Sequence, residues 1–179
     1  MFSDLLKTQR LVLRLPAKCD VESIADLMNN WNVVSRIALA PYPYELSDAE
    51  EFVERVSQRQ RTADDAVYAI TKDTSFLGVI SVAPQRRGPN IGYWLGEPYW
   101  GQGLMTEAVG AVVHEFFMQP VNQSLISGFF RGNQASWSIQ RKFGFEVTGE
   151  STIMCVARNA EIANVETELS RQRFEEVKS

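Results

Sequence analysis

Several residue types that mark particular protein classes are scarce in this chain. It has only two cysteines, Cys19 and Cys155, and one histidine, His114. Neither cysteine belongs to a Cys-x-x-Cys pair or a metal-ligand spacing, so the sequence predicts no metal centre and no disulfide framework. We expect both cysteines to be reduced packing residues. His114 has no evident triad partner, and we expect it on the surface.

Long apolar runs and an excess of positive charge are also missing. The first fifteen residues carry four charges in place of the apolar stretch of a signal peptide, and no run approaches the roughly 18 apolar residues of a membrane span. Lys and Arg number 18 against 22 Asp and Glu, a net charge of −4 that argues against nucleic acid as a partner. We therefore expect a soluble, cytoplasmic protein that binds neither membrane nor nucleic acid.

The apolar content is sufficient for one domain. The 179 residues are 45% apolar and 11% aromatic, and a chain of this length buries roughly 70% of its unfolded surface. We expect residues 1–179 to form a single domain with a core over about residues 8–170. The charged tail 171–179 is expected to fray.

The spacing of apolar residues predicts alternating strands and helices. Helices are expected after Asp20, from a Ser47/Glu50 capping box to about Arg61, at Leu104–Phe117, and from an N-cap at Asn133 to Phe143. Strands are expected at Thr8–Leu15, Val67–Thr71, Phe76–Ala83, Ile91–Leu95, Leu125–Phe130, Phe145–Val156 and Ile162–Leu169.

This order predicts an α/β (α+β) fold with a mixed sheet of about seven strands and about four helices. The strand–helix–strand passage from Ile91 to Phe130 requires a parallel pair, because a crossover helix returns the chain to the same end of the sheet. A ligand site is expected at the carboxyl end of that pair.

A glycine-rich turn lies at this point, with Gly101-Gln102-Gly103 directly before the long helix. The first N–H groups of a helix have no partner within it, and glycines let a phosphate approach the backbone, so the turn suits a diphosphate. Neither the Walker lysine nor the three-glycine dinucleotide spacing is present. For an isolated Gly-x-Gly, a tight turn before a helix is the simpler explanation.

Three motifs, in order, extend the comparison over about residues 8–170. Ile91–Ala108 resembles the acyl-CoA pyrophosphate loop of the GNAT superfamily of N-acetyltransferases. Asn133-Gln134-Ala135-Ser136, followed by Lys142-Phe143-Gly144-Phe145, resembles the second CoA-binding motif of that superfamily. Thr8–Arg14 is similar to the opening strand of its ribosomal-protein alanine/serine N-terminal acetyltransferase branch.

The resemblance implies acetyl-CoA as co-substrate, without a metal, in a GNAT-like fold. The Asn133 carboxamide would bind the pantetheine arm, although N-capping alone also explains an asparagine there. The family often has Gln or Arg where this chain has Pro98, so diphosphate binding must depend more on the backbone. Pantetheine would pair with the backbone near Leu95, and the diphosphate would lie on amides of Trp100, Gly101, Gln102, Gly103, Leu104 and Met105.

Acetyl transfer to an amine needs a base, an oxyanion donor and a proton for the departing thiolate. Many relatives carry a tyrosine acid where this chain has Gln140, and resemblance suggests Ser136 in its place, although serine also suits a helix start. Glu97, directly after the parallel strand, is the candidate base, or else a solvated turn carboxylate. Glu166 and Glu168 are the runners-up, although a polar outer face also explains them.

The acceptor is expected to be the α-amine of a protein N-terminus, such as that of a ribosomal protein, because an α-amine is more often neutral than a lysine. Acidic charge would attract such basic partners. The cleft would be walled by Trp31, Arg36, Tyr42 and Tyr44, which could equally be loop anchors. A small amine (polyamine, aminoglycoside or amino-acid derivative) and a non-catalytic CoA sensor are the alternatives. The acceptor's identity and a homodimer are left open.

Overall fold

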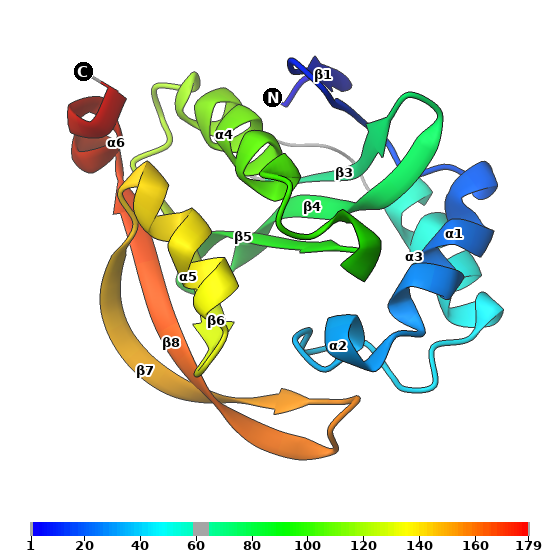
Figure 1. The fold of residues 1–179 in the computed structure, drawn as a ribbon. Coiled ribbons are helices and arrows are strands. Elements are labelled where there is room, and N and C mark those ends of the chain that lie inside the picture. The colour runs from blue at the N-terminus through cyan, green and yellow to red at the C-terminus, as the bar shows by residue number, and fades with distance from the viewer. Residues whose placement is uncertain (1, 59–64, 179) are drawn as a thin grey trace.

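One mixed sheet organises the chain (Figure 1). The computed structural model describes residues 2–58 and 65–178, with eight strands in the order β1-β2-β3-β4-β5-β6-β8-β7. Every neighbouring pair is antiparallel except β5 and β6, which confirms the expected parallel pair. The strands are β1 Leu5–Lys7, β2 Val12–Arg14, β3 Ala66–Lys72, β4 Ser75–Gln85, β5 Gly88–Leu95, β6 Ser124–Phe130, β7 Glu146–Cys155 and β8 Ala160–Ser170.

Helices cover both faces of the sheet, with α4 on one face and α1 and α3 on the other (Figure 1). Strand β3 is therefore buried on both sides: Tyr68 and Ile70 join the α4 cluster, while Val67 and Ala69 join the α1/α3 cluster. The α-helices in the described residues are α1 Val21–Met28, α2 Trp31–Val34, α3 Leu46–Gln58, α4 Leu104–Phe117, α5 Gln134–Gln140 and α6 Arg171–Lys178.

The helix α4 fixes the position of the glycine turn. Its eight apolar stripe residues are all buried, none more than 7% exposed, as the paired spacing predicts. The stripe runs from Leu104 to Phe117 and packs on β3, β4, β5 and β6. The N-terminal end of α4 is therefore held rigidly at the carboxyl end of β5.

Several expected boundaries are wrong for identifiable reasons. The strand expected at Thr8–Leu15 is interrupted by a bend, because Thr8 and Arg10 turn toward α4. Asp20 sits before α1 but does not cap it: its carboxylate accepts hydrogen bonds from Arg14, at 2.7 Å, and from the Ala17 N–H at the start of the 3-10 helix Lys18–Asp20. Ser47 lies inside α3, whose start is fixed instead by the Asp48 carboxylate accepting from the Glu45 N–H. The end expected near Arg61 lies outside the described residues.

The carboxyl-terminal tail does not fray as expected but forms α6. The Arg171 guanidinium donates to the Gln119 and Phe117 carbonyls, 2.6 and 3.1 Å away, at the end of α4. Phe174 stacks on Phe117 with ring centroids 4.6 Å apart. The charge of Arg171 therefore satisfies carbonyls at the end of α4 and, together with Phe174, anchors the segment to the domain.

The β7–β8 hairpin reaches across to the segment after α2. Val156 donates its N–H to the Ala38 carbonyl at 2.9 Å, and the Arg158 guanidinium donates to the Ser35 carbonyl at 2.7 Å. The buried Cys155 thiol donates to the Ile37 carbonyl at 3.4 Å. Cys155 is thus the packing residue expected, whereas Cys19 is exposed, contrary to expectation.

Candidate active site

The glycine turn presents backbone donors to solvent. Gly101 and Gly103 have φ of 72° and 73°, a left-handed conformation that glycine adopts without strain. Within residues 2–58 and 65–178, no group accepts a hydrogen bond from the backbone N–H groups of residues 101–106. A Cβ at Gly101 would meet no atom within 4 Å, so a ligand has room above the turn. The turn therefore fits the diphosphate of CoA.

The Trp100 backbone is the exception among the expected diphosphate ligands. Its N–H donates to the Glu97 carbonyl at 3.1 Å, closing the short 3-10 helix Glu97–Tyr99. Its indole N–H donates to the Leu95 carbonyl at 2.8 Å. The Leu95 carbonyl thus has one partner already and keeps one acceptor position for a further donor.

An ion-pair clamp ties the turn to the amino-terminal strands. Arg10 Nε lies 2.6 Å from Glu107 Oε2, and Arg10 Nη1 donates to the Gln102 carbonyl at 2.9 Å. The Thr8 hydroxyl and the Arg10 N–H also donate to Glu107. Burial alone would raise the pKa of Glu107, but these hydrogen bonds and the Arg10 charge together lower it below its ordinary value. The carboxylate in the first turn of α4 is therefore committed to structure.

The parallel strands β5 and β6 pair at only one residue, Asn90 opposite Ile126. The Ser127 hydroxyl donates to the Ile91 carbonyl at 2.9 Å, so the strands still touch one residue farther on. Beyond this point β5 keeps its pairing with β4 alone as far as Leu95. The separation leaves one edge of β5 free beside the glycine turn, where an extended arm can pair.

A hydroxyl network surrounds Ser136, beside this edge. Tyr93 Oη and Ser136 Oγ are 3.1 Å apart, and Gln140 Nε2 donates to Ser136 Oγ at 3.3 Å. Gln140, only 1% exposed, also donates to the Ser127 hydroxyl and accepts from the Thr167 hydroxyl at 2.7 Å. Sequence reasoning missed Tyr93; its place on β5 beside the expected pantetheine was the available signal.

The carboxylate of Glu97 is held by two asparagines. Asn30 Nδ2 and Asn32 Nδ2 donate to its two oxygens at 2.6 and 2.9 Å. Asn30 also caps α2 by accepting from the Asn32 N–H. Of the runners-up, Glu166 pairs with Arg87. Glu168 lies on β8 opposite Ile126 and Glu146.

Arg36 connects the expected acceptor segment with the CoA residues. Its guanidinium lies 5.3 Å from the centroid of the Trp100 ring, and Nη1 is 3.5 Å from Asn133 Oδ1. The same Asn133 oxygen accepts from the Ser136 N–H at 3.3 Å, so Asn133 caps α5 as expected. Residues from three separate segments therefore meet beside the glycine turn.

The aromatic residues of the acceptor segment divide into two groups. Trp31 and Tyr42 are each 47% exposed and pack edge to face, with ring centroids 5.2 Å apart. Tyr44 is buried with α1 and α3, and its N–H donates to Asn29 Oδ1. Trp31, Arg36 and Tyr42 are thus the exposed candidates for the acceptor cleft.

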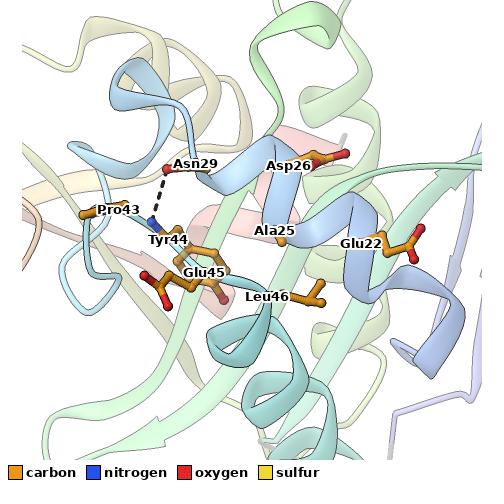
Figure 2. A pocket seen from close by; sticks show the side chains of 8 residues that line it. All are labelled: Glu22, Ala25, Asp26, Asn29, Pro43, Tyr44, Glu45 and Leu46. Atoms are coloured by element: carbon orange, nitrogen blue, oxygen red, sulfur yellow. Dashed lines mark hydrogen bonds between the residues drawn. The ribbon is translucent and has the colours of Figure 1, made fainter.

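An open hollow of about 660 Å³ lies between α1 and the start of α3 (Figure 2). On the α1 side it is lined by Glu22, Ala25 and Asp26 of α1 and by Asn29, the residue after the helix, which continue one helical face. Leu27, on the opposite face, lies against Gly96. The hollow is therefore on the far side of α1 from Glu97 and the glycine turn.

Other kinds of site were also sought in residues 2–58 and 65–178. No group of three or more His, Cys, Asp or Glu side chains there could hold a metal ion. No helix in that part of the chain is both long and apolar enough to cross a membrane. His114 is exposed on α4, as expected.

The chain is similar to known acetyltransferases in sequence and in fold. The ribosomal-protein-serine acetyltransferase of Escherichia coli is 36% identical over 53 residues, 28% of this chain and 30% of that protein, so the match spans under a third of its length.

Two solved structures show the same fold. The ribosomal-protein-S5-alanine acetyltransferase of Vibrio fischeri superposes with a TM-score of 0.79 at 15% identity, covering 96% of this chain and 99% of that one. The microcin C7 self-immunity acetyltransferase MccE, in complex with acetyl-CoA and AMP, superposes with a TM-score of 0.78 at 20% identity, covering 91% and 93%. The acetyltransferase (GNAT) domain model matches residues 10–146, and the chain therefore belongs to the GNAT acetyltransferase family.

Proposed function

We propose that this chain is an acetyl-CoA-dependent N-acetyltransferase whose acceptor is the α-amine of a protein N-terminus, such as that of a ribosomal protein. The observation that carries the proposal is the convergence of three features at one place. That place is where β5 leads into α4 and faces α5. It holds the open backbone amides of residues 101–106, the free edge of β5 and the polar groups of Glu97 and Ser136.

CoA would be held mainly by the backbone. The amides of residues 101–106 and the positive end of the α4 dipole would receive the diphosphate. The pantetheine arm would pair with the free edge of β5, next to the Asn133 carboxamide. This arrangement would bring the thioester between Glu97 and Ser136.

The proposed reaction is direct transfer. The amine nitrogen bonds to the thioester carbonyl carbon, and the resulting tetrahedral intermediate expels the sulfur as its bond to carbon breaks. The amine gives up one proton, with Glu97 as the base, and the sulfur takes one to leave as the thiol of CoA. Ser136 donates a hydrogen bond to the sulfur while negative charge develops on it.

A peptide fits the acceptor side better than a polycation. Arg36 places an exposed guanidinium beside Trp100, which would repel a polyamine but can donate to peptide carbonyls. The α-amine is also neutral more often than a lysine near neutral pH. The E. coli relative, a ribosomal-protein-serine acetyltransferase, supports the same acceptor class.

The test is thiol release from acetyl-CoA with a matched acceptor panel. The panel contains peptides with free or formyl-blocked N-termini beginning with Ser or Ala, an internal lysine peptide, spermidine and an aminoglycoside. We expect release with free N-termini only, and mass spectrometry should place the acetyl group on the α-amine. Turnover of small amines alone would contradict the peptide acceptor, and tight CoA binding without any turnover would favour a sensor.

A further inference from the structure

We propose that Tyr93 is a positioning residue of the acetyl transfer, acting with Gln140 to direct the Ser136 hydroxyl proton toward the sulfur of CoA. The inference rests on the proposed function and concerns a residue that lies within the Ile91–Ala108 motif but was given no role from the sequence. Its basis is the geometry of the hydrogen bonds in the network around Ser136.

The orientation of the Gln140 carboxamide follows from its neighbours. The Gly128 carbonyl, 3.4 Å from Gln140 Nε2, can only accept, so the nitrogen of the amide must face it. The Ser127 hydroxyl donates to the Ile91 carbonyl and accepts from the same nitrogen at 3.1 Å. On the other side, the Thr167 hydroxyl donates to Gln140 Oε1. The two hydrogens of Gln140 Nε2 thus face three acceptors, the third being Ser136 Oγ at 3.3 Å, so Gln140 shares a donor with Ser136 and cannot accept from it through this atom.

Tyr93 supplies the second donor. Its phenol oxygen lies 3.1 Å from Ser136 Oγ and 3.4 Å from the Ser136 carbonyl oxygen, which can only accept, so the one phenol proton faces Ser136 and is shared between these two oxygens. Burial raises the pKa of its phenol, and the hydrogen bonds with Ser136 and Gln140 only partly oppose this effect, so the phenol keeps its proton at neutral pH. A hydroxyl oxygen has two acceptor positions and one proton. When Tyr93 and Gln140 donate to the two acceptor positions of Ser136 Oγ, the Ser136 proton is left to point at another group.

The site of CoA binding provides that group. Tyr93 lies on β5, two residues before Leu95, and Ser136 lies in the first turn of α5 across the separation of β5 from β6. Both residues are partly buried, so water competes weakly for the Ser136 proton. As the carbon–sulfur bond breaks, the electron pair goes to sulfur and the Ser136 hydrogen bond stabilises it. Ser136 and Tyr93 both keep their protons, and the thiolate takes its proton from solvent.

The decisive experiment is a double-mutant cycle of Tyr93→Phe and Ser136→Ala. We expect Tyr93→Phe to lower kcat about five- to tenfold, the size of one hydrogen bond, with the KM for acetyl-CoA unchanged. In the Ser136→Ala background the same substitution should change kcat less than about twofold, because its target is gone. An equal loss in both backgrounds, or none in the wild type, would overturn the inference.

A binding readout separates this inference from the proposed function. Calorimetry of CoA at about pH 8, in buffers of different ionisation enthalpy, counts the protons released when the thiol ionises on binding. We expect the wild type to release most, Ser136→Ala least and Tyr93→Phe an intermediate amount. Equal release by wild type and Tyr93→Phe would overturn the role of Tyr93, even if the wild type acetylates peptides.

Tyr68→Phe is the matched control. Its phenol donates to the Ser3 carbonyl at 2.6 Å, in the core and outside the Ser136 network. This variant should lose stability but keep both kcat and proton release. If the wild type binds CoA with thiol ionisation but turns over no acceptor, the proposed acetylation is contradicted. The comparison of proton release between wild type and Tyr93→Phe would still test the role of Tyr93.

Discussion

The turn between β5 and α4 has a glutamate on each side, and the two are held very differently. Glu107, inside the first turn of α4, is paired with Arg10 and receives a further hydrogen bond from Thr8. Glu97, before the turn, receives hydrogen bonds from Asn30 and Asn32, and no Lys or Arg of residues 2–58 and 65–178 forms an ion pair with it.

The difference separates Glu107, whose carboxylate is tied up in an ion pair, from Glu97, whose carboxylate is held by neutral donors only. An arginine neutralises Glu107, so the diphosphate expected at the same helix terminus meets no unbalanced negative charge. The neutral carboxamides orient Glu97 but leave its charge in place. In the proposed reaction Glu97 is therefore the carboxylate that would take the proton, whereas Glu107 holds the turn.

Glu97→Gln should produce the largest effect. The glutamine keeps the size of the side chain but cannot accept the amine proton, so kcat should fall about a hundredfold, the lower range for general acid–base catalysis. CoA affinity should stay within about twofold, since no cation is lost. Steady-state thiol release together with calorimetry measures both. An unchanged kcat would make Glu97 a solvated turn carboxylate.

Arg10→Ala should act on binding and not on chemistry. Losing the guanidinium frees the Gln102 carbonyl and leaves Glu107 unbalanced beside the diphosphate, so CoA affinity should fall about tenfold, or roughly 1.4 kcal/mol. Calorimetry measures the change. Arg14→Ala is the control, because Arg14 pairs with Asp20 away from the turn. Equal losses in both variants would show a general effect of destabilisation.

Glu107→Gln should change the pH dependence of stability. The pKa of Glu107 is lowered in the folded chain, so its contribution is present above the ordinary carboxyl pKa and is lost as pH falls through the lowered value. Arg10 is 41% exposed and solvent screens the pair, so we expect about 1 kcal/mol or less. Urea unfolding between about pH 7 and pH 3 should give a flatter profile for the variant. Parallel profiles would contradict the clamp.

Asn32→Ala should have the smallest effect. It removes one of the two donors that orient Glu97 while Asn30 still caps α2. We expect kcat to fall about threefold without a change in CoA affinity, the cost of one partly exposed hydrogen bond. The same thiol-release assay applies. A loss as large as that of Glu97→Gln would mean that Asn32 itself contacts the reacting groups.

Local patterns were sufficient to predict the elements around the glycine turn. The paired apolar residues of α4, the Asn133 cap and the parallel pair all depend on short-range spacing, and the structure confirms them. The glycine turn was found for the same reason: its conformation and the helix after it are encoded in a few consecutive residues.

Contacts between distant segments account for what was missed. Arg10 meets Glu107 across 97 positions, Asn30 meets Glu97 across 67, and Tyr93 meets Ser136 across 43. No local period reveals such pairs. The tail was misjudged because its charges suggested solvent, although Ser170 before it accepts from the Arg173 N–H as a helix cap.

The most direct test of the account is calorimetric titration with acetyl-CoA and ATP of the wild type and Gly103→Val. Gly103 has φ of 73°, which valine adopts only with strain, so the variant should disrupt the open amides while the α4 stripe stays packed. We predict saturable 1:1 binding of acetyl-CoA to the wild type, at least about tenfold weaker binding to the variant, and no tight ATP binding. Absence of acetyl-CoA binding, or tight ATP binding that CoA cannot displace, would contradict the account.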